Sequence, residues 1–225
     1  MSQPPDQDVP VVAIVGGTGA LGRGLAKRLA AGGVRVVLGS RDAERAADAA
    51  AGLGPGVAGA TNEDSVAAAG IVVIAVPWEG HRETLASLAG ALAGKVVVDC
   101  VNPLAFDRHG PYAQSVAEGS AAMQARNLLP ASTVVAAFHH LSAVTLLDDA
   151  VDSVDADVLV LGDDRAATDL VQSLASRIAG CRGIYAGRLR NAGQVEALTA
   201  NLIAINRRYS AHAGLRVTDV CSRWG

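Results

Sequence analysis

The sequence contains few aromatic residues, few cysteines and almost no lysine. Only 3% of its 225 residues are aromatic while 50% are hydrophobic, so alanine, valine and leucine must build the core. Lys27 and Lys95 are its only lysines, and the net charge of −3 gives no reason to expect nucleic acid as a partner. The cysteines Cys100, Cys181 and Cys221 form no metal-type spacing. Their odd number and scatter are typical of a reducing compartment, so we expect a cytoplasmic protein.

Long hydrophobic runs and a signal peptide are missing as well. No apolar stretch reaches about 18 residues, the length that spans a bilayer, so we expect no membrane as partner. The segment MSQPPDQDV at residues 1–9 is polar and rich in proline, and it predicts a flexible N-terminal tail rather than a targeting signal. The histidines show no His-x-x-x-His spacing, which argues against a metal site.

Strand patterns and helix patterns alternate along most of the chain. Apolar runs predict strands at residues 11–15, 34–38, 57–60, 71–76, 96–99, 133–137 and 158–161 and near 184. Helical spacing predicts helices at residues 20–31, 43–51, 116–129, 166–178 and 192–208. This alternation predicts an α/β fold with a doubly wound, mostly parallel sheet. We assign residues 10–186 to this sheet domain and residues 187–225 to a C-terminal helical extension.

A glycine-rich turn, GGTGALG, follows the first predicted strand and opens the first predicted helix. Gly17, Gly19 and Gly22 fit the pattern G-x-G-x-x-G, in which the glycines allow a tight turn, close approach of a pyrophosphate, and close helix–strand packing. The N-terminus of the helix then offers free N–H groups to the phosphates. The turn predicts a dinucleotide-binding domain of the Rossmann type, although a glycine turn can also serve packing alone.

The end of the second predicted strand reads VVLGSRDAER and lacks the carboxylate that binds the ribose of NAD. Ser40 and Arg41 stand there, and Arg45 follows one helical turn later. Arginine offers a planar fork of donors to phosphate oxygens, and serine adds a hydroxyl. This pattern predicts NADP rather than NAD. The alternative is that both arginines are solvated charges balanced by Asp42 and Glu44.

A proton donor for a reductase is hard to find in the sequence. No tyrosine is followed four residues later by lysine, so the chemistry of short-chain reductases is absent. Lys27 lies in the first predicted helix, and Lys95 enters a strand from the end opposite to the ligands. His139 and His140 follow the predicted strand VVAAF at the ligand-binding end of the sheet. If the chain is extended there, only one of them faces the site; alternatively, they form a loop pair without a role.

Several segments together resemble the NADPH-dependent reductases of coenzyme F420, a deazaflavin. The resemblance covers nearly all of the chain and includes AIVGGTGALGRGLAKRLA, VVLGSR, NED, VPWE, NPL, EGSAA, VVAAFHHLSA and VLVLGDD. The glycine turn and the SR pair are common to NADP-binding folds, whereas VPWE and FHHLSA are more specific. The sequence departs from the family pattern where serine stands for proline at Ser142 and arginine for lysine at Arg45.

The resemblance implies that a hydride passes directly between nicotinamide C4 and deazaflavin C5. Such a transfer needs no catalytic acid, and His139 would serve at most to orient the ring. The residues that the resemblance assigns to NADP(H) are Gly17, Thr18, Gly19, Ala20, Leu21, Gly22, Ser40, Arg41, Arg45, Trp78, Leu104 and Ala143. Those that it assigns to the deazaflavin are His139, Leu141 and Ala213. Trp78, Leu104 and Ala143 also fit a purely structural role.

Two further expectations concern partners. Because the deazaflavin has a phosphate and an acidic tail, arginines in the C-terminal part are candidates to attract it, or they are ordinary surface charges. The final helix is rich in alanine and leucine, and such a helix often packs against a second subunit. We therefore expect the protein to form a homodimer. Two other functions stay open: an NADP(H)-dependent reductase of another small acceptor, such as a flavin or an imine, and a non-catalytic NADP(H)-sensing module. The C-terminal arginines that are candidates to attract the acidic tail are Arg188, Arg190, Arg207, Arg208 and Arg216.

Overall fold

A computed structural model describes residues 10–220, so the predicted tail at 1–9 and Cys221 lie outside the described residues. The strands of the main sheet are β1 (Val12–Val15), β2 (Val36–Ser40), β3 (Val57–Thr61), β4 (Ile71–Ile74), β5 (Val96–Asp99), β8 (Thr133–Ala136), β9 (Ala156–Gly162) and β10 (Cys181–Gly187). A separate hairpin consists of β6 (Leu104–Asp107) and β7 (Gly110–Ala113). The helices are α1 (Ala20–Ala31), α2 (Ala43–Ala51), α3 (Asn62–Ala67), α4 (Trp78–Leu92), α5 (Ala121–Leu128), α6 (Ala143–Leu147), α7 (Arg165–Ala175) and α8 (Ala192–Tyr209), with the 3-10 turn η1 (Leu189–Asn191) before α8.

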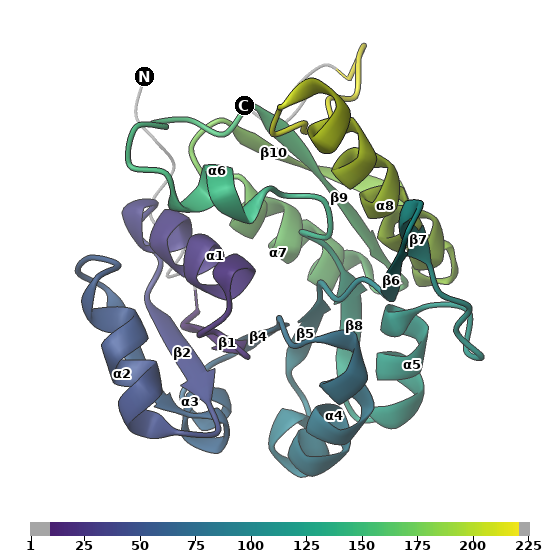
Figure 1. Cartoon of the computed structure of the whole chain (residues 1–225). Helices are drawn as coiled ribbons and strands as arrows, with labels where there is room; N and C mark the ends of the chain where they lie inside the picture. The colour runs from purple at the N-terminus through teal and green to yellow at the C-terminus, as the bar shows by residue number, and fades with distance from the viewer. Residues whose placement is uncertain (1–9, 221–225) are drawn as a thin grey trace.

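The main sheet has the strand order β10-β9-β8-β5-β4-β1-β2-β3 (Figure 1). All neighbouring strands in it are parallel except β8 and β9, which are antiparallel. Because β9 runs against β8, its first residues extend past the carboxyl end of β8, where α8 and α6 also lie. The predicted doubly wound, mostly parallel α/β sheet is confirmed.

Each central strand supplies side chains to two hydrophobic layers. In β1, Val12 and Ile14 pack in one layer with Leu25 of α1, whereas Ala13 and Val15 pack in the other with residues of α3, α4 and α5. All four β1 residues are fully buried. Successive strand residues point to opposite faces, so a strand covered by helices on both faces must be apolar throughout. This requirement is why the strands appear in the sequence as unbroken apolar runs.

The predicted helices at 20–31 and 43–51 and the predicted strand at 96–99 match the structure to the residue. The helix predicted at 116–129 begins only at Ala121, because Gly119 has a φ of 95° and Ser120 caps the first turn. The Oγ of Ser120 accepts a hydrogen bond from the N–H of Met123 at 3.0 Å. The sequence analysis did not identify α3, α4, α6 or the β6–β7 hairpin.

The C-terminal extension predicted at 187–225 is helical only in part. After α8, residues 211–220 run without helix or strand beside the start of β9, where the N–H of Asp157 donates to the carbonyl of Leu215 at 2.7 Å. The buried carboxylate of Asp157 accepts hydrogen bonds from the guanidinium groups of Arg182 and Arg216 and from the N–H of Val217. Burial raises the pKa of Asp157, but these donors lower it to about 2. The ion cluster therefore attaches this segment to the sheet, while a domain boundary at residue 186 stays a prediction.

A second buried carboxylate attaches α8 to α5. The two carboxylate oxygens of Glu196 accept hydrogen bonds from the N–H groups of Ala121 and Ala122 at 2.9 and 3.1 Å. These N–H groups belong to the first turn of α5 and have no partner inside that helix. Glu196 is only 2% exposed. Burial raises its pKa to about 7, although the two N–H donors act in the opposite direction.

We expect the protein to become less stable as the pH rises, because Glu196 then loses its proton. Its pKa is raised on folding from about 4.3, so its contribution to stability is fully present below that pH and is lost as the pH rises toward 7. Urea unfolding at pH 5.0 and 7.5 should show that wild type loses about 1–3 kcal/mol relative to Glu196→Gln. Equal pH dependence in the two proteins would contradict this prediction.

Candidate functional site

The parallel register places the last residues of β1, β4, β5 and β8 in one row across the sheet, together with the residue before the last in β2. Gly39 of β2 lies beside Val15 of β1, which lies beside Ile74 of β4. Ile74 in turn pairs with Asp99 of β5, and Asp99 pairs with Ala136 of β8. Parallel α/β sheets bind ligands outside the carboxyl ends of their strands. The loops that follow these five residues therefore define the candidate site, and nearly all predicted site residues lie in them.

The glycine turn lies after β1, in the middle of this row. The N–H of Gly17 donates to the carbonyl of Gly39, which joins the turn to the end of β2. A Cβ at Gly17 would lie 2.7 Å from the carbonyl oxygen of Ile14, and one at Gly22 would lie 2.8 Å from Cα of Gly17. A Cβ at Gly19, in contrast, would have its nearest neighbour at 3.5 Å. Gly17 and Gly22 are thus required by packing, whereas Gly19 borders open space.

The first turn of α1 faces that open space and is not capped by a side chain. Gly19 is the N-cap residue, no side chain accepts from the first N–H groups, and the first turn contains no acidic residue. Thr18, Ala20 and Leu21 are all partly or fully exposed. Uncapped N–H groups at a helix N-terminus, together with the helix dipole, form a site that suits a phosphate. These features fit a pyrophosphate, and the binding role of the turn stays a prediction.

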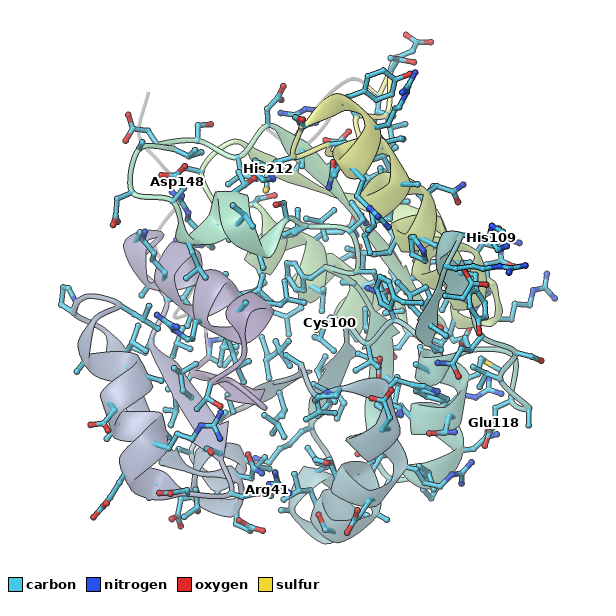
Figure 2. The ribbon with its side chains drawn as sticks, viewed as in Figure 1. Arg41, Cys100, His109, Glu118, Asp148 and His212 are labelled. Atoms are coloured by element: carbon cyan, nitrogen blue, oxygen red, sulfur yellow. The ribbon has the colours of Figure 1, made fainter. Side chains whose placement is uncertain are left out.

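Positive charge stands beside the turn, at the carboxyl end of β2. Ser40 ends β2, and Figure 2 shows Arg41 next to it. The neighbouring Asp42 does not pair with either arginine: its carboxylate caps α2 by accepting from the N–H groups of Glu44 and Arg45. Arg41 and Arg45 are exposed, and within residues 10–220 neither forms an ion pair. Asp42 therefore does not balance these arginines, and both the anion site and the alternative of solvated charges stay open.

The loop after β4 brings Trp78 to the site, supported by a buried pair that the sequence analysis did not identify. The rings of Trp78 and His81 have their centroids 5.5 Å apart. The Nε2 of His81 lies 2.6 Å from a carboxylate oxygen of Asp99, and its Nδ1 lies 3.0 Å from the Oε1 of Gln124. Burial lowers the pKa of His81, but the hydrogen bond and the charge of the Asp99 carboxylate raise this pKa by more. The net shift of the pKa is therefore upward. The only signal in the sequence was Asp99 at the end of an otherwise apolar strand.

The loops after β5 and β8 meet at the backbone carbonyl of His139. Nδ2 of Asn102 donates to this oxygen at 2.8 Å, and Oγ1 of Thr199 in α8 donates to it at 3.1 Å. Within the described residues, neither ring nitrogen of His139 nor Oδ1 of Asn102 has a hydrogen-bond partner, although all three atoms are buried. Burial lowers the pKa of His139 to about 4, so the ring is neutral at pH 7.

The backbone at His139 and His140 is a turn and not extended, so the condition for expecting only one of the two rings to face the site is not met. The Nε2 of His140 lies 2.6 Å from the carbonyl oxygen of Asp157 and so contacts β9. Phe138, just before them, is fully buried and has a φ of 64°, a strained value for a bulky residue. Ser142, the departure from the family pattern, caps α6 by accepting from the N–H of Thr145 at 3.3 Å.

The remaining predicted site residues are placed as follows. Leu104 begins β6, Leu141 is buried next to His140, and Ala143 is the first residue of α6. Ala213 lies in the segment after α8, where its N–H donates to Oδ1 of Asn206 at 2.7 Å. The first three follow β5 and β8 directly, whereas Ala213 reaches this side of the sheet only through the C-terminal segment. No observation assigns a ligand to any of them, so their roles stay predictions.

Among residues 10–220, Cys100 beside the site is not a reactive thiol, and no cluster of side chains suits a metal ion. Cys100, at the end of β5 in Figure 2, is buried, and burial raises the pKa of its thiol, so it stays protonated. Among residues 10–220, no group of histidine, cysteine and acidic side chains has the geometry to hold a metal ion. In the same range, no helix is long and apolar enough to cross a membrane. A cavity of about 770 Å³ lies away from the row of strand ends, beside α7 and the end of β9.

Comparison with known proteins shows the family to which this chain belongs. Residues 11–103 match the protein family described as NADP oxidoreductase, coenzyme F420-dependent. The F420-dependent NADP reductase of Methanothermobacter thermautotrophicus is 39% identical over 221 residues, which cover 93% of this chain and 95% of the relative. The chain belongs to the F420-dependent NADP reductase family.

Two other relatives place the F420-dependent NADP reductase family in context. One is a crystal structure of a protein from Arthrobacter sp. FB24, assigned as an F420-dependent NADP reductase, with a TM-score of 0.75 and 29% sequence identity. The matched region covers 92% of this chain and 98% of the Arthrobacter chain. The metalloreductase STEAP3 of Rattus norvegicus is 37% identical over 198 residues, covering 88% of this chain but 38% of the rat protein. The fold of this chain is thus shared with a solved structure assigned as an F420-dependent NADP reductase.

We expect Gly19→Ala to separate NADPH binding from folding in this reductase. The new Cβ has room in the protein alone but occupies the space beside the first turn of α1. The dissociation constant for NADPH should rise about tenfold, a loss of about 1.4 kcal/mol, while the melting temperature stays within a degree or two. The matched variant Gly22→Ala should instead lower the melting temperature, because its Cβ meets the backbone of Gly17. Calorimetric titration and thermal unfolding of both variants test this, and unchanged NADPH affinity in Gly19→Ala would contradict it.

Proposed function

We propose that this protein transfers a hydride between NADP(H) and the deazaflavin coenzyme F420. The observation that carries the proposal is the order of features along the row of strand ends. Cationic side chains lie after β2, uncapped helix N–H groups after β1, an aromatic ring after β4, and buried unpartnered polar atoms after β5 and β8. This is the order of parts in a bound NADPH, from its 2′-phosphate to its nicotinamide, with a second ring system beyond it.

The residues on the page would bind and orient the two ligands. Arg41 and Arg45 would hold the 2′-phosphate, and the first turn of α1 would hold the pyrophosphate. Trp78, kept in place by the buried pair of His81 and Asp99, would support the nicotinamide half. When bound, NADPH supplies the hydride at nicotinamide C4 and the deazaflavin takes it up at C5. Because that transfer needs no protein acid, the neutral, buried His139 is suited to orient a ring and not to donate a proton.

We further infer a cytoplasmic homodimer that has no nucleic acid or membrane as partner. Among the described residues, Cys100 and Cys181 are free thiols, which fits a reducing compartment. Ile205 and Tyr209 of α8 are 40% and 72% exposed, and an apolar surface of this kind on the last helix supports contact with a second copy. The net charge of −3 offers no general attraction for nucleic acid.

The direct test is a spectrophotometric assay with NADPH and oxidised coenzyme F420. We expect rapid loss of the visible absorbance of the deazaflavin with NADPH and little loss with NADH. A protein that binds NADPH but leaves that absorbance unchanged would contradict the proposal. Flavin and imine acceptors should be supplied in parallel, since their reduction in place of the deazaflavin would assign the protein to another reductase activity. Tight NADPH binding with no acceptor reduced would identify a sensing module.

We expect the arginines after β2 to decide the preference for NADPH over NADH. Two hydrogen bonds to a charged phosphate are worth about 1.5–3 kcal/mol each, so Arg41→Ala combined with Arg45→Ala should lower the ratio of kcat/KM for NADPH to that for NADH by about 100-fold or more. The loss should arise in KM for NADPH, with kinetics for NADH nearly unchanged. Arg35→Ala, an exposed arginine before β2, is the matched control. An unchanged ratio in the double variant would remove these arginines from the site.

A further inference from the structure

A cluster of three arginines and a histidine lies outside the site described so far, between the β6–β7 turn and the end of α8. Arg108 and His109 come from the turn, and Arg207 and Arg208 come from the last turn of the helix. Together with Gly110, Pro111 and Ala204 they line a pocket of about 360 Å³. Figure 2 shows His109 at the outer end of the hairpin, on the side of α8. We call this the basic pocket.

No carboxylate among the described residues pairs with the arginines of the basic pocket. Within residues 10–220, none of Arg108, Arg207 and Arg208 forms an ion pair. The nearby Asp107 is engaged in the turn itself, where its carboxylate accepts from the N–H groups of His109 and Gly110. Nε of Arg108 donates to Nε2 of His109 at 2.9 Å, which joins the two side chains of the turn. Three guanidinium groups therefore gather without an anion.

The two elements that form the basic pocket are both attached to the candidate site through one atom. The carbonyl oxygen of His139 accepts from Asn102, which directly precedes the hairpin, and from Thr199 of α8. Arg207 lies eight residues, about 12 Å, further along α8 than Thr199. The strand β7 of the hairpin packs against α8, so the two elements that hold the carbonyl of His139 also form the walls of the basic pocket at their outer ends.

We propose that the basic pocket binds the anionic tail of the deazaflavin substrate. This tail carries a phosphate and carboxylates on a flexible chain joined to the ring system. Arginine forks suit both phosphate and carboxylate oxygens, and at a partly exposed site they mainly raise affinity for an anion and the rate of its capture. The inference rests on the proposed function, because the tail belongs to the acceptor. It adds a determinant of acceptor choice that lies away from the reacting rings.

The test compares two deazaflavins that differ only in the tail: the complete coenzyme, and a form that ends at the ribityl hydroxyl. Their dissociation constants are measured by fluorescence titration at low ionic strength, without NADPH and therefore without turnover. In wild type, the complete coenzyme should bind at least tenfold more tightly than the tailless form. Arg207→Gln combined with Arg208→Gln should reduce this preference about tenfold at low ionic strength. At high salt the double variant and wild type should show the same preference, because salt weakens the binding of the tail by wild type to the same extent.

Matched variants separate a local effect from one of net charge or folding. Arg35→Gln combined with Arg165→Gln removes two exposed arginines elsewhere and should leave the preference intact. The charge-preserving pair Arg207→Lys and Arg208→Lys should retain most of it, and circular dichroism should show native folding for all variants. Inorganic phosphate at millimolar concentration should weaken binding of the complete coenzyme and not of the tailless form.

Two results would overturn the inference. One is an equal loss of affinity for both deazaflavins in the double glutamine variant, which would indicate a structural role for the arginines. The other is an unchanged preference at low ionic strength, which would show that the pocket does not contact the tail. The proposed function is judged separately, since hydride transfer from NADPH to the tailless deazaflavin is read by absorbance and does not involve the tail. A protein that fails that assay but keeps the binding preference retains the tail site and loses the proposed reaction.

Discussion

The constraint on which the rest of the molecule depends is the shared register of five parallel strands. Because Gly39, Val15, Ile74, Asp99 and Ala136 lie in one row, the five loops that follow them open on the same side of the sheet. No loop needs to be long to reach a common ligand. The register is maintained by side chains that are buried on both faces, and a slip of one residue would exchange the two layers. Stability and site geometry thus depend on the same contacts.

The same principle explains which parts of the fold were predictable from sequence. A strand covered on both faces must be apolar, so β1, β4 and β5 stood out, and α1 was marked by glycines at both ends. The long helix α4 was missed because it contains two glycines and is held mainly by a few leucines packed against the sheet. The β6–β7 hairpin was missed because its strands have only four residues each and are half exposed, and packing on α8 stabilises it. Such tertiary contacts leave no local pattern.

The residues of the candidate site were likewise predictable from the sequence only in part. Residues next to strand ends, such as Gly19 and Arg41, were found because motif and strand are adjacent in sequence. The support of the site was not found, because it is made by contacts between distant segments: His81 with Asp99, and Thr199 with the carbonyl of His139. Each partner is unremarkable alone, since a histidine in a helix or a threonine in a helix predicts nothing. Only the folded chain brings them together.

Buried polar atoms without a partner and a strained backbone residue lie together beside the end of the row. Phe138 has a left-handed backbone conformation, and the next residue, His139, has two buried ring nitrogens without a partner among the described residues. Oδ1 of Asn102 is unpartnered beside them. Buried polar atoms without hydrogen bonds each cost about 1–3 kcal/mol, and a strained backbone residue adds a similar amount. The chain retains this cost although Asn102 and Thr199 hold the His139 carbonyl in place. A ring system with its own donors and acceptors, placed against these atoms, would recover part of it on binding.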